Sequence, residues 1–179
     1  MKKTIGFLSA VLVFTNIAFA QTFTLKSKDL GGQATSKQFL NAMGCTGENS
    51  SPQLSWENAP AGTQAFAVTM YDRDAPTGSG LWHWVVFNIP STVNELKTGA
   101  GDVSKLVAPK ECVQSNNDFG KPGYLGVCPP PGQRHEYLIT VYALKTKLEL
   151  PATTSPAVVG FYLGQATLGK ASLVIYAQQ

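Results

Sequence analysis

The chain has 179 residues, of which 44% are hydrophobic and only 14% are charged, a composition typical of one folded domain and not of a disordered chain. Fourteen Lys and Arg residues against eleven Asp and Glu residues give a net charge of +3, and the longest basic run is Lys2-Lys3. Nucleic-acid-binding proteins carry clustered basic patches, so the charge pattern argues against that class.

The first twenty residues have the features of a secretory signal peptide. Two lysines form a basic start, an apolar stretch follows over residues 5–14, and Ala18-Phe19-Ala20 places small residues where signal peptidase reads them. We expect cleavage before Gln21, a periplasmic or secreted protein, and a single domain over residues 21–179. An uncleaved anchor is the alternative, but the apolar stretch is short for a bilayer, and no later segment is apolar enough to cross one.

Short runs rich in Val, Ile, Thr and aromatic residues dominate the rest of the chain. Clusters of Gly, Pro, Asn and Ser bound these runs, which is typical of an all-β protein. The expected strands are Phe23–Lys26, Leu54–Glu57, Ala65–Asp72, Leu81–Pro90, Tyr137–Lys145 and Ala171–Ala177. The third and fourth runs are apolar on both alternating faces, as central strands covered on both sides are. The predicted fold is therefore a β-sandwich of two antiparallel sheets.

One short helix is expected near the C-terminus. Ser155-Pro156 offers an N-cap and a first-turn proline, and apolar residues recur over 158–166, although two glycines there weaken the pattern. Residues 97–133 instead contain Gly, Pro, Asn and Asp throughout, with little periodicity. A loop of that length in a compact domain is usually functional, so we expect it to form the wall of a binding site.

The three cysteines, Cys45, Cys112 and Cys128, become informative if the protein is exported. An oxidising compartment allows one internal disulfide in any of three pairings. Cys45 and Cys128 both lie in Gly-rich loops, which favours that pair, and the bridge would restrict the unfolded chain by roughly 4 to 5 kcal/mol. Cys112 would then be free, buried or joined to another chain. A metal site is the rival interpretation, but no C-x-x-C pair occurs.

The chain contains only two histidines, His83 and His135, and each lies in or beside an expected strand. Strand alternation places His83 on the same face as Val85 and Phe87. The same alternation puts His135 and Tyr137 on one face, about 6.6 to 6.8 Å apart along the strand. One small anion can bridge that separation.

Two carboxylates, Asp72 and Asp74, end an expected strand and share a face if strand geometry continues that far. Each of these residues also has a structural explanation. An aspartate can start a turn, and a buried histidine or tyrosine can be an ordinary core residue. Arg134 and Glu136 fit a solvated strand edge, and Asn88 fits a structural hydrogen-bonding residue.

Several ordered blocks resemble the phosphatidylethanolamine-binding protein family, in its exported bacterial YbhB/YbcL type (Raf kinase inhibitor protein-like). The blocks are Glu48-Asn49-Ser50-Ser51-Pro52-Gln53-Leu54-Ser55-Trp56, Asp72-Arg73-Asp74-Ala75-Pro76, Trp82-His83-Trp84-Val85-Val86-Phe87-Asn88-Ile89-Pro90, Asn117-Asp118-Phe119-Gly120-Lys121-Pro122-Gly123-Tyr124 and Cys128-Pro129-Pro130-Pro131-Gly132-Gln133-Arg134-His135-Glu136-Tyr137. They occur in family order, and such a series is far more specific than any one block.

The resemblance implies a β-sandwich with a small pocket for the phosphate of a phospholipid headgroup or a similar anion, and no cofactor. The residues that match the family's pocket are Asp72, Asp74, His83, His135 and Tyr137, with Pro129 and Pro130 in its rim. Two departures bear on the identity of the headgroup. Arg73 replaces the usual proline between the aspartates, and Glu136 stands where many members have a basic residue or histidine.

The leading hypothesis is a non-enzymatic protein that binds a phosphate-like anion. Because two carboxylates would repel a phosphate, we assign Asp72 and Asp74 to a cationic group or to backbone donors. The Tyr137 hydroxyl and a histidine N–H would donate to the anion, so affinity should rise as the pH falls through the histidine range. The resemblance adds a possible role as an exported regulator or inhibitor of a kinase or protease.

Two other classes of function stay open. The two histidines and two aspartates could hold a metal ion for hydrolysis, although no H-E-x-x-H motif or nucleophile elbow occurs. The chain could also be a self-associating protein, such as a homodimer, in which the pocket is vestigial and Cys112 links chains.

Overall fold

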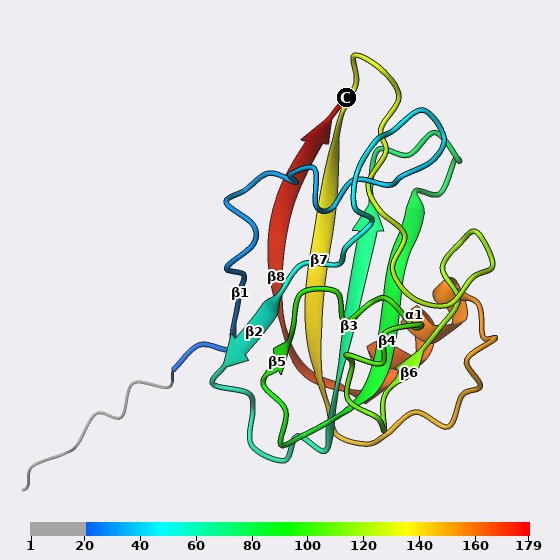
Figure 1. The fold of residues 1–179 in the computed structure, drawn as a ribbon. Helices are drawn as coiled ribbons and strands as arrows, with labels where there is room; N and C mark the ends of the chain where they lie inside the picture. Colours follow the sequence, from blue (N-terminus) through cyan, green and yellow to red (C-terminus); the bar gives the residue numbers. More distant parts are fainter. Residues whose placement is uncertain (1–20) are drawn as a thin grey trace, which may run out of the picture.

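The computed structural model describes residues 21–179, so the expected signal peptide over residues 1–20 lies outside the described part of the chain. The elements, shown in Figure 1, are β1 (Thr24–Lys26), β2 (Leu54–Glu57), β3 (Ala65–Asp72), β4 (Leu81–Pro90), β5 (Glu95–Leu96), β6 (Val113–Gln114), β7 (Arg134–Leu144), α1 (Pro156–Ala166) and β8 (Thr167–Gln178). No helix within the described residues has the length and apolarity that crossing a membrane requires.

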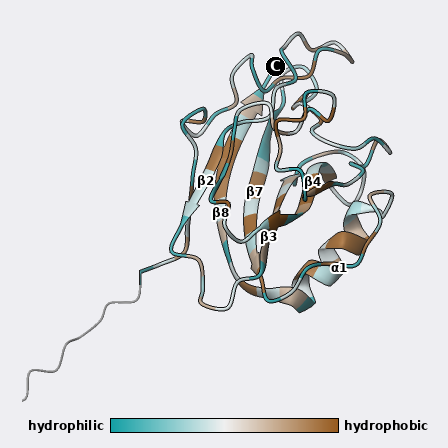
Figure 2. Cartoon of the chain, turned by 60° about the horizontal axis from the view of Figure 1, so that its bottom comes forward, coloured by the Kyte–Doolittle hydropathy of each residue, from teal (hydrophilic) through white to brown (hydrophobic). Residues whose placement is uncertain are grey.

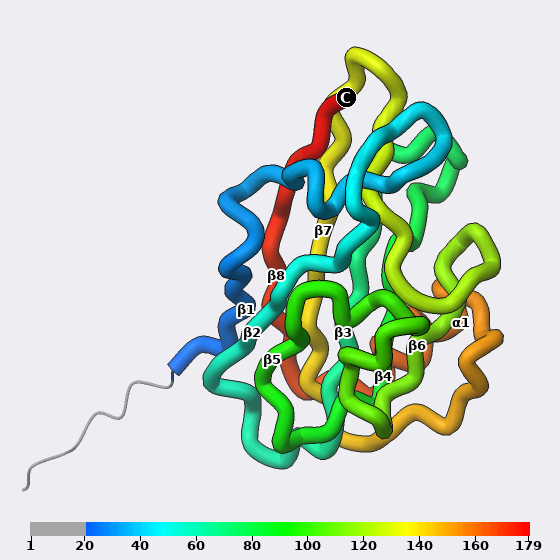
Figure 3. The backbone as a smooth tube through the Cα atoms, in the orientation of Figure 1, coloured from blue at the N-terminus to red at the C-terminus, as the bar shows by residue number. Residues whose placement is uncertain are grey.

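The strands form two antiparallel sheets, as predicted. A small sheet has the order β1-β2-β5, and a larger one has the order β6-β4-β3-β7-β8. Figures 1 and 3 show the small sheet lying in front of the larger one, on the side of β8, β7 and β3. The fold is therefore a β-sandwich, with a single short helix in residues 21–179.

The larger sheet is covered on both faces, which explains why β3 and β4 are apolar throughout. One face packs against the small sheet, where Val68 and Met70 meet Leu54 and Trp56. The other face packs beneath α1, where Val159 is among the buried residues. Figure 2 shows α1 on the opposite side of β3 and β4 from β2. The prediction that these two strands are covered on either side is confirmed.

Some element boundaries differ from the sequence-based expectation. The strands β5 and β6 have two residues each, too few to show an alternating pattern. Both β7 and β8 begin earlier than expected, because they pair along their whole length from Arg134 opposite Gln178 to Leu144 opposite Thr167. The helix α1 begins at Pro156 as expected, but the Ser155 side chain makes no capping hydrogen bond.

The structural interpretation of Asn88 is confirmed. Its side-chain amide donates to the carbonyl of Leu148 at 2.9 Å, and its side-chain oxygen accepts from the Leu148 amide at 2.8 Å. The backbone of Asn88 is left-handed, with φ of 58°, a conformation that asparagine tolerates better than most residues. Asn88 therefore ties the end of β4 to the segment that leads into α1.

We expect Asn88→Ala to lower the free energy of unfolding by about 2 to 3 kcal/mol, because it removes two hydrogen bonds and puts alanine in a left-handed conformation. Asn58→Ala is the matched control, since Asn58 has φ of 60° but is exposed and donates one bond, to Thr22. Urea unfolding of both variants measures the difference. Equal losses in the two variants would show that the pair of bonds to Leu148 contributes nothing.

Candidate functional site

A β-bulge in β4 decides where His83 points. Met70 of β3 pairs with Trp84, but the next residue, Tyr71, pairs with Trp82, so His83 is an extra residue in the ladder. An extra residue lets two successive side chains project from the same side of the sheet. His83 therefore lies on the face of Trp84, between the two sheets.

The prediction that His83 shares a face with Val85 and Phe87 is thus wrong. Those two residues belong to the core beneath α1. The His83 ring instead meets the ring of Tyr137 edge-on, with the centroids 5.2 Å apart. Strand alternation failed here because the bulge interrupts it, and a single sequence carries no signal for a bulge at that residue.

Asp72 lies at the centre of the site, at the end of β3. Its Oδ2 atom accepts a hydrogen bond from Nδ1 of His135 at 2.8 Å, and Nε2 of His83 lies 3.9 Å from the same oxygen. Its Oδ1 atom accepts from the backbone amide of Asp74 at 2.9 Å. Asp72, His83 and His135 are each at most 5% exposed. The structure thus gathers both histidines around one buried carboxylate.

The hydrogen bond at Nδ1 of His83 sets which ring nitrogen carries the proton. This nitrogen lies 2.9 Å from the carbonyl oxygen of Leu125, which can only accept, so Nδ1 is the donor. Burial lowers the pKa of His83 below its ordinary value of 6.5, against the opposing effects of the Leu125 carbonyl and the Asp72 charge. Neutral His83 therefore presents the lone pair of Nε2, an acceptor, toward Asp72.

His135 is placed differently. Its Nδ1 faces the Asp72 carboxylate, and its Nε2 lies 3.3 Å from the side-chain oxygen of Gln133. The Asp72 carboxylate can only accept, so Nδ1 of His135 is the donor in this bond. Asp72 and His135 thus form a buried hydrogen-bonded pair.

Tyr137 lies beneath the cluster and is fully buried. Its hydroxyl makes no hydrogen bond to any described residue. Burial raises the pKa of Tyr137, and the negative charge of Asp72 raises it further. The hydroxyl is therefore a protonated donor without a partner, next to the Asp72 and His135 pair.

A pocket of about 260 Å³ opens above the cluster. Its floor contains Asp72, His83 and His135, and its walls are mainly apolar. The lining residues are Leu40, Met43, Asp72, Ala75, Pro76, Thr77, Leu81, His83, Phe119, Leu125, Gly126, Cys128, Pro130 and His135. Charged groups interact more strongly between apolar walls than in water, so the pocket suits one small charged group. As expected, part of the wall comes from residues 97–133.

Three of the residues expected in the pocket do not line it. The strand β3 ends at Asp72, so Asp74 leaves the strand face, and its carboxylate accepts from the backbone amide of Glu136 at 2.7 Å. Pro130 lines the pocket, whereas Pro129 is buried behind the rim. Tyr137 contributes no surface to it. Asp74 therefore bonds to a backbone donor, which is one of the two roles predicted for the aspartates.

The two departures from the family pattern contact each other. Arg73 donates to the Glu136 carboxylate at 2.7 Å across the ends of β3 and β7. Both side chains are partly exposed, so the pair contributes little to stability. Neither Arg73 nor Glu136 lines the pocket.

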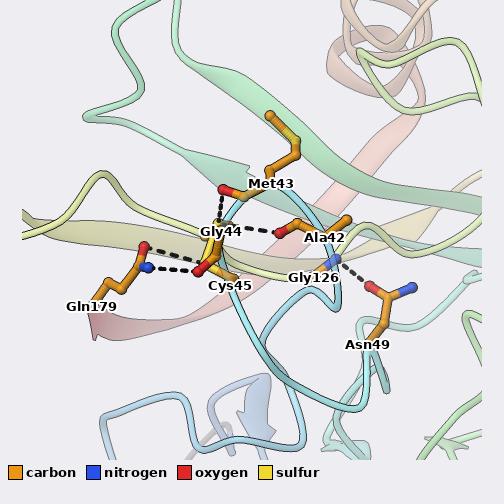
Figure 4. Close-up of a disulfide and its surroundings, with 8 residues drawn as sticks. Ala42, Met43, Gly44, Cys45, Asn49, Gly126 and Gln179 are labelled. Atoms are coloured by element: carbon orange, nitrogen blue, oxygen red, sulfur yellow. Dashed lines mark hydrogen bonds between the residues drawn. A yellow bond between two sulfur atoms is a disulfide. The ribbon is translucent and has the colours of Figure 1, made fainter.

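Cys45 and Cys128 form a disulfide, as predicted, with their Cα atoms 5.9 Å apart (Figure 4). The bridge is consistent with an oxidising compartment. Cys112 is a free, half-buried thiol, and burial raises its pKa to about 11. Such a thiol is almost entirely protonated at neutral pH and therefore unreactive.

The arrangement of the cluster does not suit a metal ion. Within residues 21–179, no group of three or more His, Cys, Asp and Glu side chains is arranged to hold one. Asp74 points away, and the Asp72 carboxylate is already bonded to His135 and to a backbone amide. The His and Asp cluster is therefore not the metal site that the hydrolase hypothesis needs.

Sequence reasoning missed several parts of the site. The Leu125 carbonyl sets the proton position on His83, but a backbone carbonyl has no signature in a sequence. Leu40 and Met43 come from a segment far from the histidines in the chain. The predicted disulfide was the available signal. Leu40 and Met43 lie just before Cys45, and its expected partner Cys128 lies in the block that contains His135.

The fold and the site together define a class of protein, a two-sheet β-sandwich with a small pocket above a buried His and Asp cluster. The chain is 44% identical over 170 residues to the UPF0098 protein YbcL of Escherichia coli (strain K12), an overlap of 92% of this chain and 93% of YbcL. It is 46% identical over 153 residues to the UPF0098 protein YbhB of the same organism, covering 83% and 96% of the two chains.

Structural comparison agrees with these similarities. The crystal structure of E. coli YbcL, described as a member of the mammalian PEBP family, matches with a TM-score of 0.85 and 42% identity. The match covers 88% of this chain and 98% of that one. The model of the family described as phosphatidylethanolamine-binding protein matches residues 31–178. This chain belongs to the phosphatidylethanolamine-binding protein family.

Proposed function

We propose that this chain is a non-enzymatic binding protein whose pocket takes one phosphate-like anion, either free phosphate or the phosphate of a larger molecule such as a phospholipid headgroup. The observation that carries the proposal is the pair of buried histidines around Asp72 at the floor of a small, mainly apolar pocket. Histidine is the side chain that gains a positive charge most readily near neutral pH.

The charges of the cluster imply that an anion binds together with a proton. His135 already donates from Nδ1 to Asp72, and neutral His83 offers only an acceptor to the pocket. An anion cannot bond to that lone pair. Once His83 is protonated, Nδ1 still donates to Leu125, and Nε2 becomes a charge-assisted donor for the anion. Binding therefore takes up about one proton at His83.

The size of the pocket limits what it can hold. A volume of about 260 Å³ accommodates a phosphate and a few attached atoms, so acyl chains or the remainder of a partner would stay outside. We include export in the proposal, supported by the disulfide and by the N-terminal sequence pattern. A role as regulator or inhibitor of a kinase or protease stays a prediction, as does a homodimer.

Addition of millimolar phosphate or phosphoethanolamine should shift the imidazole NMR signals of both His83 and His135. Because the chain has only these two histidines, specific labelling gives one set of signals for each ring. His83 should move further, since its Nε2 gains a proton and a new partner. A titration at pH 6, with glucose as the uncharged comparison, measures both shifts.

The matched variants are His83→Asn, which keeps a donor near Leu125, and Glu57→Gln, which changes an exposed carboxylate in β2. The first should abolish the response of His135 to phosphate, and the second should leave it unchanged. Imidazole signals that stay still at millimolar phosphate in the unaltered protein would remove the proposal.

A further inference from the structure

We propose that the Cys45–Cys128 disulfide holds one wall of the anion pocket in place, so that the affinity of the pocket for phosphate depends on this bond being oxidised. The inference rests on the proposed function of the pocket. It assigns the bridge a positioning role in binding, beyond its effect on folding stability.

The first observation is that the disulfide joins two parts of the same wall. Leu40 and Met43 lie just before Cys45, and both line the pocket. On the other side of the bridge, Cys128 itself lines the pocket together with Pro130. The bond thus connects the two segments whose separation sets the width of the pocket on this side.

The second observation is that residues 41–46 have few other attachments. Their one main-chain hydrogen bond runs from the Cys45 amide to the Ala42 carbonyl, inside the segment, and none connects them to the main chain of the rest of residues 21–179. The Gln179 side chain donates to the Gly44 carbonyl at 2.9 Å (Figure 4). Met43 is 69% exposed. Without the disulfide, Leu40 would stay attached, because its amide donates to the Val127 carbonyl at 3.0 Å. Residues 41–46, which include Met43, would depend on the exposed Gln179 bond and on weak thiol contacts.

The polar floor of the pocket is anchored differently. Asp72, His83 and His135 lie on β3, β4 and β7, and β3 pairs with both of the other strands in the middle of the larger sheet. Cleavage of the disulfide leaves these strands paired. The floor should therefore keep its geometry while the wall moves outward and water enters.

The chemical step is thiol–disulfide exchange with a dithiol reductant. One thiolate of the reductant attacks a sulfur of the bridge, and its second thiol then resolves the mixed disulfide. The protein gains two electrons and two protons and ends with two thiols, while the dithiol is oxidised to its own disulfide. Water beside His83 then weakens the charge-assisted bond to the anion, because the local dielectric constant rises. We expect the affinity for phosphate to fall at least tenfold.

The experiment compares the oxidised protein, the dithiothreitol-reduced protein and the Cys45→Ser/Cys128→Ser variant. All carry Cys112→Ser, so that the bridge is the sole redox-active group among the cysteines. Titration with inorganic phosphate at pH 6, followed through the histidine NMR signals, gives the affinity. A second readout needs no ligand: the pKa of His83 should move back toward 6.5 after reduction, because burial is what lowers it. Circular dichroism checks that the sheets persist.

Each outcome decides between the two proposals. At least tenfold weaker binding after reduction, with the His83 pKa shifted, supports the inference. Affinities within twofold of each other overturn the inference and leave the proposed function standing. An oxidised protein that does not bind phosphate overturns both.

Met43→Ala in the oxidised protein tests the same wall if the reduced chain unfolds. Leu106→Ala is the matched control, because Leu106 is also exposed and left-handed, with φ of 52° against 56° for Met43, but does not line this pocket. Phosphate binding at least threefold weaker in Met43→Ala than in Leu106→Ala supports the inference. Equal affinities overturn it.

Discussion

Asp72→Asn should lower the free energy of unfolding by about 3 kcal/mol at pH 7. The Asp72 carboxylate is buried and accepts hydrogen bonds from His135 and from the backbone amide of Asp74. An asparagine oxygen can accept one of these bonds, but its NH₂ group then faces the second donor, which is left buried without an acceptor. Breaking a buried pair by removing one partner typically costs 3 to 5 kcal/mol.

A double-mutant cycle with His135→Gln separates the pair from the rest of the cluster. The two single variants and the double variant, unfolded in urea, should give a coupling energy of about 2 kcal/mol between Asp72 and His135. Glu57→Gln is the control, because Glu57 and Lys26 are also 2.8 Å apart but their side chains are 58% and 60% exposed. That variant should lose less than about 1 kcal/mol. A coupling energy near zero would show that the buried bond does not hold the site together.

The prediction of the fold succeeded where one face or both faces of a strand are buried along their length. The bounds of β2, β3 and β4 agree with the predicted runs, and Asn58, Gly80 and Ser91 mark the end of β2 and the two ends of β4. The prediction was poorer for β5 and β6, which form only because the chain passes beside β2 and β4. Pairing of that kind depends on tertiary contacts, which local composition does not record.

Four of the predicted site residues, Asp72, His83, Pro130 and His135, line the pocket, whereas Asp74, Pro129 and Tyr137 do not. Asp72, His83 and His135 meet around one oxygen, although a bulge turned His83 to the face opposite to the one expected. Asp74 was expected beside Asp72 because strand alternation was extended past the end of β3. Bulges and strand ends are set by pairing with neighbouring strands, so a reading of one strand at a time cannot locate them.

The position of the proton on His83 also connects the proposed binding to folding stability. The Leu125 carbonyl fixes the donor, and burial favours the neutral ring. The unliganded protein therefore prefers a form of His83 that cannot bond to an anion. An anion can bind only when His83 is protonated, and a lower pH favours that form of the ring.

Acidification from pH 7 toward pH 5 should destabilise the unliganded protein and strengthen its binding of sulfate. The pKa of His83 is below 6.5 in the folded protein, so between that lowered pKa and 6.5 the unfolded chain binds more protons. The free energy of unfolding therefore falls as the pH drops below 6.5, by at most about 1.4 kcal/mol per pH unit from this one group, and levels off below the folded pKa. Above pH 6.5 its contribution is fully present.

Sulfate binding should show the opposite trend, because the anion selects protonated His83. Its affinity should rise by up to tenfold per unit fall in pH above the pKa of His83 and then level off. Sulfate keeps its charge over this range, so the change reports on the protein. Asp72 and Asp118 act on His83 through their negative charges, and the unaltered protein and the His83→Asn variant both retain them.

The comparison is between the unaltered protein and His83→Asn, by urea unfolding and sulfate titration at several pH values from 5 to 7.5. The variant keeps a donor near Leu125 but has no titrating side chain at position 83. Both slopes should flatten in His83→Asn, and any dependence on pH that remains belongs to other residues. Parallel pH profiles in the two proteins would show that another residue titrates. They would also show that anion binding does not take up its proton at His83.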